Sequence, residues 1–295
     1  MKQILVATDF SAHADRALEY AVALVNLFGS KLELMTSAWV PPIVTSDPVP
    51  LSAGGVTIPA GFLQAAREQA ASRLEEAATP LRQSGLDVTC TVMLEEPSST
   101  ICAHAEEVQA DLLVLVTRGL SGLKHVLVGS VAERTARSAP CPVLTAHADS
   151  PPAGSFEKLL VPTDFSDCAE GALRFAQSVA AKSGATLLIQ HASHIPISLE
   201  SDMFRLDAPV FEGLEAEARR KLAEVEAELD VPCESFLTRG IPDVEIVDQS
   251  RARGADLIVM GTRGRTGLAH LVLGSTAERV IRHATAPVIS VGAHG

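Results

Sequence analysis

A repeat within the chain constrains the fold more than any other feature of its 295 residues. The tetrapeptide Thr-Asp-Phe-Ser occurs at Thr8–Ser11 and again at Thr163–Ser166, an offset of 155 residues (163 − 8). A second block, "TRGLSGLKHVLVGSVAER" from Thr117, matches "TRGRTGLAHLVLGSTAER" from Thr262 at eleven of eighteen positions, with an offset of 145 (262 − 117). The smaller second offset means that the first copy carries ten more residues in its middle. The chain is therefore an internal duplication, and each copy has the size of an ordinary domain.

A polar stretch, "HADSPPAGSFEK" from His147, separates the two copies. Two prolines and a glycine interrupt any regular structure there. We therefore predict two domains, residues 1–148 and residues 156–295.

Within each copy, short apolar runs alternate with stretches of helical periodicity. In the second copy the apolar runs are Leu159–Val161, Thr186–Gln190, Cys233–Thr238, Leu257–Met260 and Pro287–Val291. Alternating strands and helices with nearly all-apolar strands are typical of a parallel sheet covered on both faces. The sequence predicts an α/β protein with two tandem doubly wound, Rossmann-like parallel sheets, in which ligands bind at the carboxyl ends of the strands.

The charge and composition exclude several classes of function. A net charge of −12 argues against nucleic acid or an anionic membrane as the main partner, because both need a positive surface. No apolar run approaches the roughly 18 residues of a membrane span, and Asp9 interrupts the first apolar run too early for a signal peptide. The five cysteines are never spaced as Cys-x-x-Cys, so we expect reduced thiols and a cytoplasmic protein.

A glycine-rich segment, "GTRGRTGLAHLVLGS" from Gly261, follows the apolar strand "ADLIVM". Glycines there let the backbone turn and let a ligand approach the main chain, and Ser275 or Thr276 would cap a following helix. The amides at a helix start favour phosphate, and Arg263 and Arg265 would add charge-assisted contacts. No P-loop and no G-x-G-x-x-G after a first strand occurs. From spacing alone, two interpretations stay open: the glycines hold phosphate, or they serve turns and close helix–sheet packing.

The segment has the form G-x2-G-x9-G-[ST] and resembles the nucleotide-binding signature of the universal stress protein family. "VPTDFS", "IPDVEI", "ADLIVMGTRG" and "PVISV" fall in that family's order, and the resemblance covers essentially the whole chain, twice. It implies a tandem member of the adenine nucleotide alpha hydrolase-like fold. It also implies that the final strands of the two copies, otherwise exposed edges, pair within the chain as a pseudo-dimer, and that two chains form a homo-oligomer such as a homodimer.

The resemblance further implies an ATP site in the second copy. Its nucleoside side would use Pro162, Thr163 and Asp164, with the backbone of Ala192 at the adenine and Met260 and Gly261 near the ribose. The phosphates would be held by Gly264, Gly274, Ser275 and Thr276, with Arg263 and Arg265 nearby. Magnesium would bridge phosphate oxygens with few protein ligands, so we expect no dedicated metal residues. Asp164 has a second possible role, to cap the following helix.

The first copy departs from this pattern. Val116 stands for Gly261, Glu95 for Gly240, Leu120 for Arg265 and Val131 for Thr276. A valine restricts the backbone and places a branched side chain where the ribose would pass, and Glu95 adds a negative charge. We therefore expect the second copy to bind ATP and the first to bind it weakly or not at all.

Residues 39–62 of the first copy form a proline-rich, apolar stretch that is long for a connector. It would cover the first pocket, bind a partner, pack against another chain or simply pack over its own domain.

Three functions from different classes remain open. The first is an ATP-binding regulatory protein of the stress response, the second a slow ATPase, and the third a nucleotide-independent interaction protein. A zinc site at His191 and His194 is a further, less favoured possibility, because no Cys/His spacing fits a structural zinc site. His125 and His270 are equivalent in the two copies, which favours a structural role for both.

Overall fold

The computed structural model describes the whole chain except residues 40–59, 117–129, 148, 195–207, 265–272 and 293–295. Its strands are β1 (Gln3–Ala7), β2 (Lys31–Ser37), β3 (Val88–Met93), β4 (Leu112–Val116), β5 (Val143–Ala146), β6 (Lys158–Pro162), β7 (Thr186–Ser193), β8 (Cys233–Arg239), β9 (Leu257–Gly261) and β10 (Val288–Val291). Its helices are α1 (Ala12–Phe28), α2 (Ala60–Gln83), α3 (Pro97–Glu107), α4 (Ser130–Ser138), α5 (Asp167–Ser183), α6 (Ala208–Ala227), α7 (Pro242–Arg253) and α8 (Ser275–His283).

The strands form one sheet in the order β3-β2-β1-β4-β5-β10-β9-β6-β7-β8. Within each half the neighbouring strands are parallel and follow the doubly wound order 3-2-1-4-5. The predicted α/β fold with two tandem parallel sheets is therefore confirmed. In such a sheet the strand order reverses between the first and fourth strands, which places a crevice beyond the carboxyl ends of β6 and β9 in the second half.

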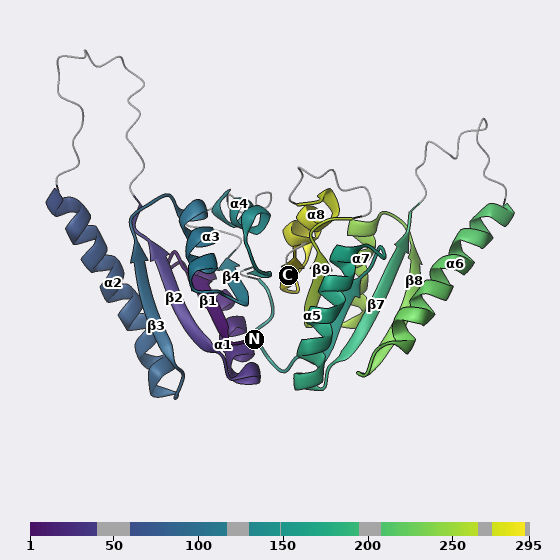
Figure 1. Cartoon of the computed structure of the whole chain (residues 1–295), viewed down its shortest axis with the longest axis horizontal. Helices are drawn as coiled ribbons and strands as arrows, with labels where there is room; N and C mark the ends of the chain where they lie inside the picture. The colour runs from purple at the N-terminus through teal and green to yellow at the C-terminus, as the bar shows by residue number, and fades with distance from the viewer. Residues whose placement is uncertain (40–59, 117–129, 148, 195–207, 265–272, 293–295) are drawn as a thin grey trace, which may run out of the picture.

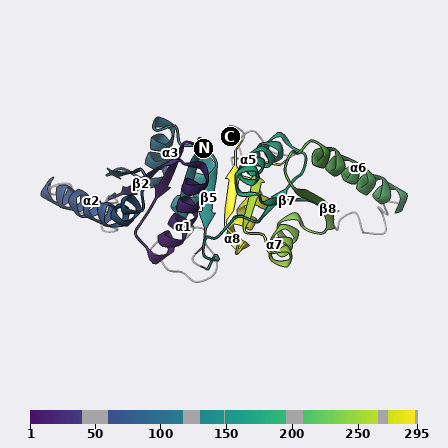
Figure 2. The ribbon, with the colours of Figure 1, turned by 90° about the horizontal axis from the view of Figure 1, so that it is seen from below.

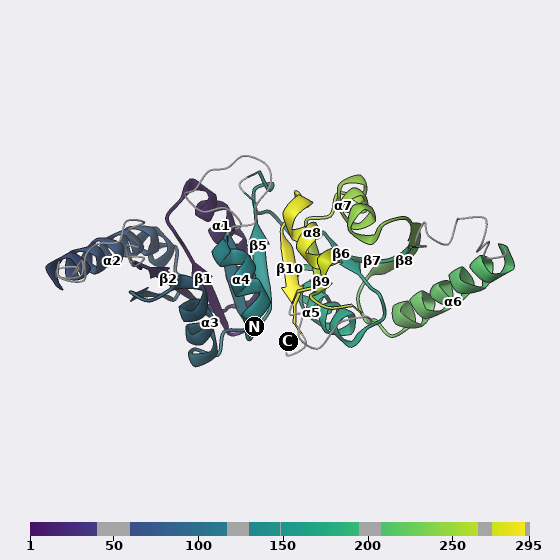
Figure 3. The same ribbon diagram turned by 90° about the horizontal axis from the view of Figure 1, so that it is seen from above.

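The two halves join through β5 and β10, which lie side by side at the centre of the molecule (Figures 2 and 3). They pair antiparallel, with Leu144 opposite Ile289. On either side of this pair, Thr145 Oγ1 donates to the carbonyl of Val288 and Ser290 Oγ donates to the carbonyl of Val143, both at 3.3 Å. Because Thr145 and Ser290 are equivalent in the two copies, the contacts repeat about a local twofold axis. The expected pairing of the halves as an intrachain pseudo-dimer is confirmed.

Two helices continue this junction on one face of the sheet. Arg137 of α4 contacts Glu133 of its own helix at 2.8 Å and Glu278 of α8 at 3.4 Å. The buried His147 imidazole lies 2.6 Å from the carbonyl of Ile281, near the end of α8. Each half is thus fixed to the other by side chains as well as by the sheet.

A hydrophobic layer covers each face of the sheet and runs through both halves. One layer packs residues of α1, α2, α5 and α6 against the strands, and the other packs residues of α3, α4, α7 and α8. The outer helices α2 and α6 lie at the two ends of the molecule, and both termini lie near its middle (Figure 1). Among the described helices, none is both long and apolar enough to cross a membrane.

Several strands extend beyond their predicted bounds, β7 by the most residues. The apolar run predicts a strand ending at Gln190, but β7 continues to Ser193, because its last residues pair with Leu237–Arg239 of β8. Most of the proline-rich stretch lies outside the described residues, and of its described ends Trp39 and Phe62 are exposed.

The helices after the third strand start differently in the two halves. In the first half the Glu96 carboxylate caps α3, accepting from the amide of Ser99 at 2.9 Å and from the hydroxyls of Ser98 and Ser99. These hydrogen bonds, the one from the Ser99 amide above all, lower the pKa of Glu96 to about 2. The equivalent residue of the second half, Ile241, has no side chain that can cap α7.

Replacing this cap tests its contribution. We expect Glu96→Ala to lower the free energy of unfolding at pH 7 by about 1 kcal/mol, measured by urea denaturation. Because the folded pKa is lowered, the stabilisation is complete above the unfolded pKa near 4.5 and is lost as the pH falls toward about 2. The exposed Glu106→Ala on the same helix should change stability by less than about 0.5 kcal/mol. Equal stability of Glu96→Ala and wild type at pH 7 would refute the cap.

Candidate functional site

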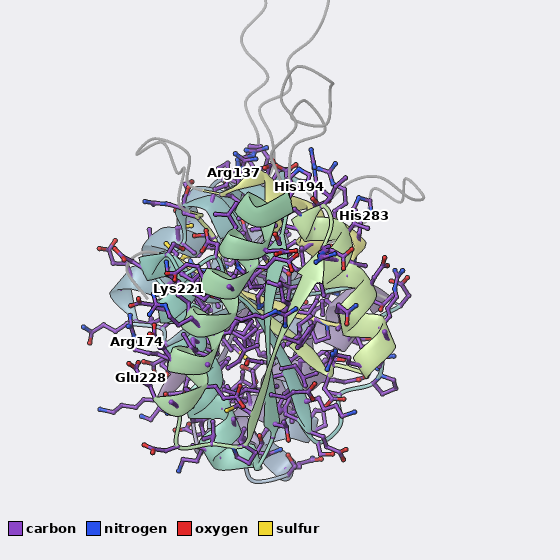
Figure 4. The ribbon with its side chains drawn as sticks, turned by 90° about the vertical axis from the view of Figure 1, so that its right-hand side faces the viewer. Arg137, Arg174, His194, Lys221, Glu228 and His283 are labelled. Carbon is purple, nitrogen blue, oxygen red and sulfur yellow. The ribbon has the colours of Figure 1, made fainter. Side chains whose placement is uncertain are left out.

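The second half contains a cavity of about 960 Å³ at the carboxyl ends of β6, β7 and β9. Its wall includes the starts of α7 and α8 and one face of α6. In Figure 4 His194 and Lys221, both of which line the cavity, lie above Glu228, which follows the last residue of α6. The crevice predicted from the strand order therefore exists.

Every predicted site residue that lies within the described chain lines this cavity. These residues are Pro162, Thr163, Asp164, Ala192, Met260, Gly261, Arg263, Gly264, Gly274, Ser275 and Thr276. Arg265 lies outside the described residues. Segments 98 residues apart in sequence, from Pro162 to Met260, thus meet around one space (260 − 162).

The start of α8 forms part of the cavity wall, and the N-cap residue predicted for this helix is wrong. The N-cap is Gly274, not Ser275 or Thr276, and it provides no side-chain hydrogen bond. The Gly274 amide is itself used, donating to the carbonyl of Thr262 at 2.7 Å. The next three amides, of residues 275–277, have no intrahelical acceptor because they belong to the first turn, and no described group accepts from them. A glycine cap thus leaves three amides directed along the helix axis for an outside acceptor.

Arg263 adds a cation to this end. It lies in the cavity wall, its side chain is half-buried, and its Nε is buried without a hydrogen-bond partner in the described part of the chain. Burying such a donor without a partner is unfavourable, so an acceptor placed in the cavity would stabilise it. Uncapped amides and an arginine are the groups that bind phosphate.

The loop that contains Thr163, Asp164 and Phe165 forms another part of the wall. Asp164 does not cap α5: the N-cap is Ser166, whose hydroxyl accepts from the amide of Ala169. The Asp164 carboxylate instead orders the loop, because its Oδ1 accepts from the amide of Ser166 at 3.1 Å and from its hydroxyl at 2.6 Å. The predicted capping role of Asp164 is therefore wrong in detail, and its carboxylate still lines the cavity.

Gly261 has a packing role that the sequence left open. A Cβ atom there would lie 2.8 Å from the carbonyl carbon and 2.9 Å from the oxygen of Cys168, and 3.0 Å from the amide of Ala169. Helix α5 therefore approaches β9 more closely than any side chain permits. A Cβ on Gly264 would lie 2.8 Å from the Asp164 carboxylate, so this glycine lets the two walls meet.

The other predicted residues are held by the sheet. Pro162 is the last residue of β6, and Met260 is buried in β9 among the side chains under α7 and α8. Ala192 lies within β7, paired with Thr238 of β8, rather than beyond the strand end. For Met260 the packing role is clear, and its side chain is part of the core.

The sequence analysis did not assign cavity roles to Phe165, His191, Glu217 or Lys221, all of which line the cavity. Phe165 has a positive φ of 61°, held by its amide, which donates to Thr163 Oγ1 at 3.0 Å. The centre of the Phe165 ring lies 4.7 Å from that of the His191 ring and 5.5 Å from the Lys221 ammonium. The repeated Thr-Asp-Phe-Ser motif was the signal for Phe165, but only the packing of α6 identifies Glu217 and Lys221.

The zinc hypothesis gains no support from the described residues. No three His, Cys, Asp or Glu side chains come together there in a way that could hold a metal ion. His191 Nδ1 is bound to the carbonyl of Thr163 at 2.8 Å. His125 and His270 lie outside the described residues.

A cavity at the switch point of a doubly wound sheet, with amides and an arginine in its wall, places the chain among Rossmann-like α/β proteins. The profile of the universal stress protein family matches residues 1–147 and 155–292. The chain therefore belongs to the universal stress protein family, with two repeats in one polypeptide.

Some relatives match both repeats. A universal stress protein of Mycolicibacterium smegmatis is 29% identical over 98% of this chain and 96% of its own length. Universal stress protein Rv2005c of Mycobacterium tuberculosis is 30% identical over 69% of this chain and 68% of its own. A universal stress protein from Archaeoglobus fulgidus has a similar fold, with a TM-score of 0.74, 24% identity, and 99% and 98% of the two chains covered.

The close approach of α5 to β9 predicts that Gly261→Ala is destabilising. The added methyl group would overlap backbone atoms that cannot rotate away, so we expect a loss of about 1–3 kcal/mol in urea denaturation. Gly292→Ala is the matched control, since its Cβ would meet no atom within 4 Å, and it should change stability by less than about 0.5 kcal/mol. Wild-type stability for Gly261→Ala would show that α5 does not need this glycine.

Proposed function

We propose that the second half of the chain binds ATP and that the protein is a regulator in the stress response, whose bound nucleotide stabilises one conformation. The observation that supports this most strongly is the uncapped start of α8, with Arg263 beside it, at one end of a cavity large enough for a nucleotide. The signature shared with the family points to the same residues.

The phosphates would occupy the end formed by Gly264, Gly274, Ser275 and Thr276, with Arg263 and Arg265 nearby. The helix dipole and three unpaired amides favour negative charge at this end. The nucleoside would extend toward Thr163, Asp164 and Ala192, where the wall carries apolar and aromatic groups. The surface therefore changes from anion-binding to base-binding along the cavity.

Magnesium would be held mainly through phosphate oxygens, because Mg²⁺ keeps several waters and needs few protein ligands. The carboxylate of Asp164 lies in the wall and fits such a role, directly or through water. The ion would neutralise phosphate charge, while the amides and Arg263 fix the orientation of the chain.

The first half would bind ATP weakly or not at all. In the second half, Gly261 lets α5 approach β9 closely. The equivalent residue of the first half is Val116, whose side chain requires a wider separation of helix and strand. The Glu96 carboxylate also occupies the start of α3. Both differences support a division of labour between the halves.

A slow ATPase is the second candidate. Hydrolysis needs a positioned water and stabilisation of the transferring phosphoryl group. Two carboxylates line the cavity, Asp164 and Glu217, but Asp164 orders its own loop and Glu217 pairs with Arg220 at 2.6 Å. This favours binding without efficient turnover, and the third candidate is an interaction protein that uses no nucleotide.

A charge at the cap of α8 tests the phosphate site. In Gly274→Asp the carboxylate would itself accept from the open amides and repel phosphate, so ATP affinity should fall roughly 10- to 100-fold in calorimetric titration while the chain stays folded. The equivalent Gly129→Asp in the first half is the matched control and should leave ATP affinity unchanged. Equal loss in both variants, or in neither, would contradict binding by the second half.

Native mass spectrometry of the gently purified full chain separates the three functions. We expect co-purified ATP, and little ADP after incubation with ATP and Mg²⁺. Steady ADP production would instead support the ATPase, and protein that stays empty in excess ATP would support the interaction protein. The same spectra measure the mass of the assembly and so test the expected association of two chains.

The five cysteines are all free in the structure. Burial raises the pKa of Cys102 to about 11 and that of Cys141 to about 12, so both thiols stay protonated near neutral pH. Free thiols in both halves are typical of a reducing compartment and support a cytoplasmic location.

A further inference from the structure

The two halves use different residues for one hydrogen bond at the base of the cavity. In the second half, His191 Nδ1 lies 2.8 Å from the carbonyl oxygen of Thr163. In the first half the equivalent residues are Thr36 and Thr8, and Thr36 Oγ1 donates to the Thr8 carbonyl at 2.7 Å. A threonine is thus sufficient to tie the second strand to the loop that follows the first. Compared with threonine, the imidazole has a second ring nitrogen, Nε2, that this hydrogen bond does not use.

The bond to Thr163 sets the tautomer of His191. A carbonyl oxygen can only accept, so Nδ1 carries the proton and donates. In the neutral ring, Nε2 is then an acceptor with a lone pair in the ring plane. No described residue of the chain supplies a hydrogen-bond partner for Nε2.

The ring is also fixed in position. Phe165 lies against it, with 4.7 Å between ring centres and 33° between the planes. Phe165 is fixed in turn by its amide, which donates to Thr163 Oγ1. An acceptor held from two sides loses little conformational freedom when a ligand binds, so its hydrogen bond contributes fully to selectivity.

His191 lies in the part of the cavity wall formed by β7 and α6, whereas the open amides belong to α8. A nucleotide whose phosphates bind at α8 therefore directs its base toward β7. Bases differ at this kind of contact: adenine carries an exocyclic amine, a donor, where hypoxanthine and guanine carry a carbonyl oxygen, an acceptor.

We propose that His191 Nε2 accepts a hydrogen bond from the exocyclic amine of the bound base and so selects 6-amino-purine nucleotides over 6-oxo-purine nucleotides. The inference rests on the proposed nucleotide site in the second half. His191 is here a specificity-determining residue, and the first half, with Thr36, lacks it.

The test compares ATP with ITP, in which an oxo group replaces the 6-amino group of the purine and N1 carries a hydrogen. Affinities of both are measured by calorimetry for wild type and for His191→Thr, which copies the first half's own solution and keeps a donor for the Thr163 carbonyl. We expect wild type to prefer ATP, and the ratio of the ATP and ITP affinities to fall about tenfold in His191→Thr, mainly through weaker ATP binding. Unfolding of the ligand-free variant should match wild type.

The outcomes are distinguishable. An unchanged ratio in His191→Thr, with ATP still bound, overturns the role of His191 and leaves the nucleotide site intact. Wild type that binds neither nucleotide overturns the proposed function itself.

Nuclear magnetic resonance of the wild-type chain with ¹⁵N-labelled histidine provides a second test that needs no substitution. The His191 Nε2 signal should shift on addition of ATP but not of ITP. Equal responses to both nucleotides would overturn the inference even if His191→Thr failed to fold.

Discussion

The antiparallel pairing of β5 with β10 is the interaction on which the architecture depends. Each half alone would expose the hydrogen-bonding edge of its last strand, and an unpaired edge promotes association with other chains. Joining the two edges makes one continuous sheet with a hydrophobic layer on each face. Because the pairing is antiparallel about Leu144 and Ile289, the carboxyl ends of the strands in the two halves are related by a local twofold axis. The duplication therefore produces two equivalent positions for a site, of which the sequence has kept the features of one.

The differences between the halves fall at the positions that a ligand would use. Gly261, where α5 approaches β9, is a valine in the first half, and His191 is a threonine. The junction shows the opposite behaviour, since Glu133 and Arg137 of the first half are again glutamate and arginine at Glu278 and Arg282. The Glu-Arg pair at the junction is thus the same in both copies, whereas part of the cavity wall has diverged between them.

The sequence predicted the topology well because its strongest signals are local. Apolar runs, the repeat and the glycine segment are each readable without knowing what packs against them. Of the two interpretations left open for the glycines, close packing is confirmed at Gly261, whereas phosphate binding at Gly274, which leaves amides unpaired, stays a prediction. The spacing of the glycines could not show which of them serves packing, because that depends on how closely α5 approaches β9.

Other features lay beyond prediction because they join residues far apart in sequence. The buried Glu33 of β2 accepts from Thr91 Oγ1 at 2.6 Å and lies 2.7 Å from His104 Nε2, in a place where the second half has Leu188. Read alone, a glutamate in the middle of an apolar strand gives no indication of its partners. The contact of Lys221 with the cavity likewise depends on which face of α6 meets β7, and the long polar helix does not reveal this. The predicted end of β7 was wrong for the same reason, because pairing with β8 extends this strand.

Helix α8 connects the cavity to the junction between the halves. Its first turn supplies the open amides, and one turn later Glu278 reaches Arg137 of the other half. Near its end, the Ile281 carbonyl lies 2.6 Å from the buried His147 imidazole, also of the other half. The helix has only nine residues, so a displacement of its start cannot be absorbed along its length without disturbing these contacts. An anion bound at the first turn would therefore contact an element that the opposite half already holds.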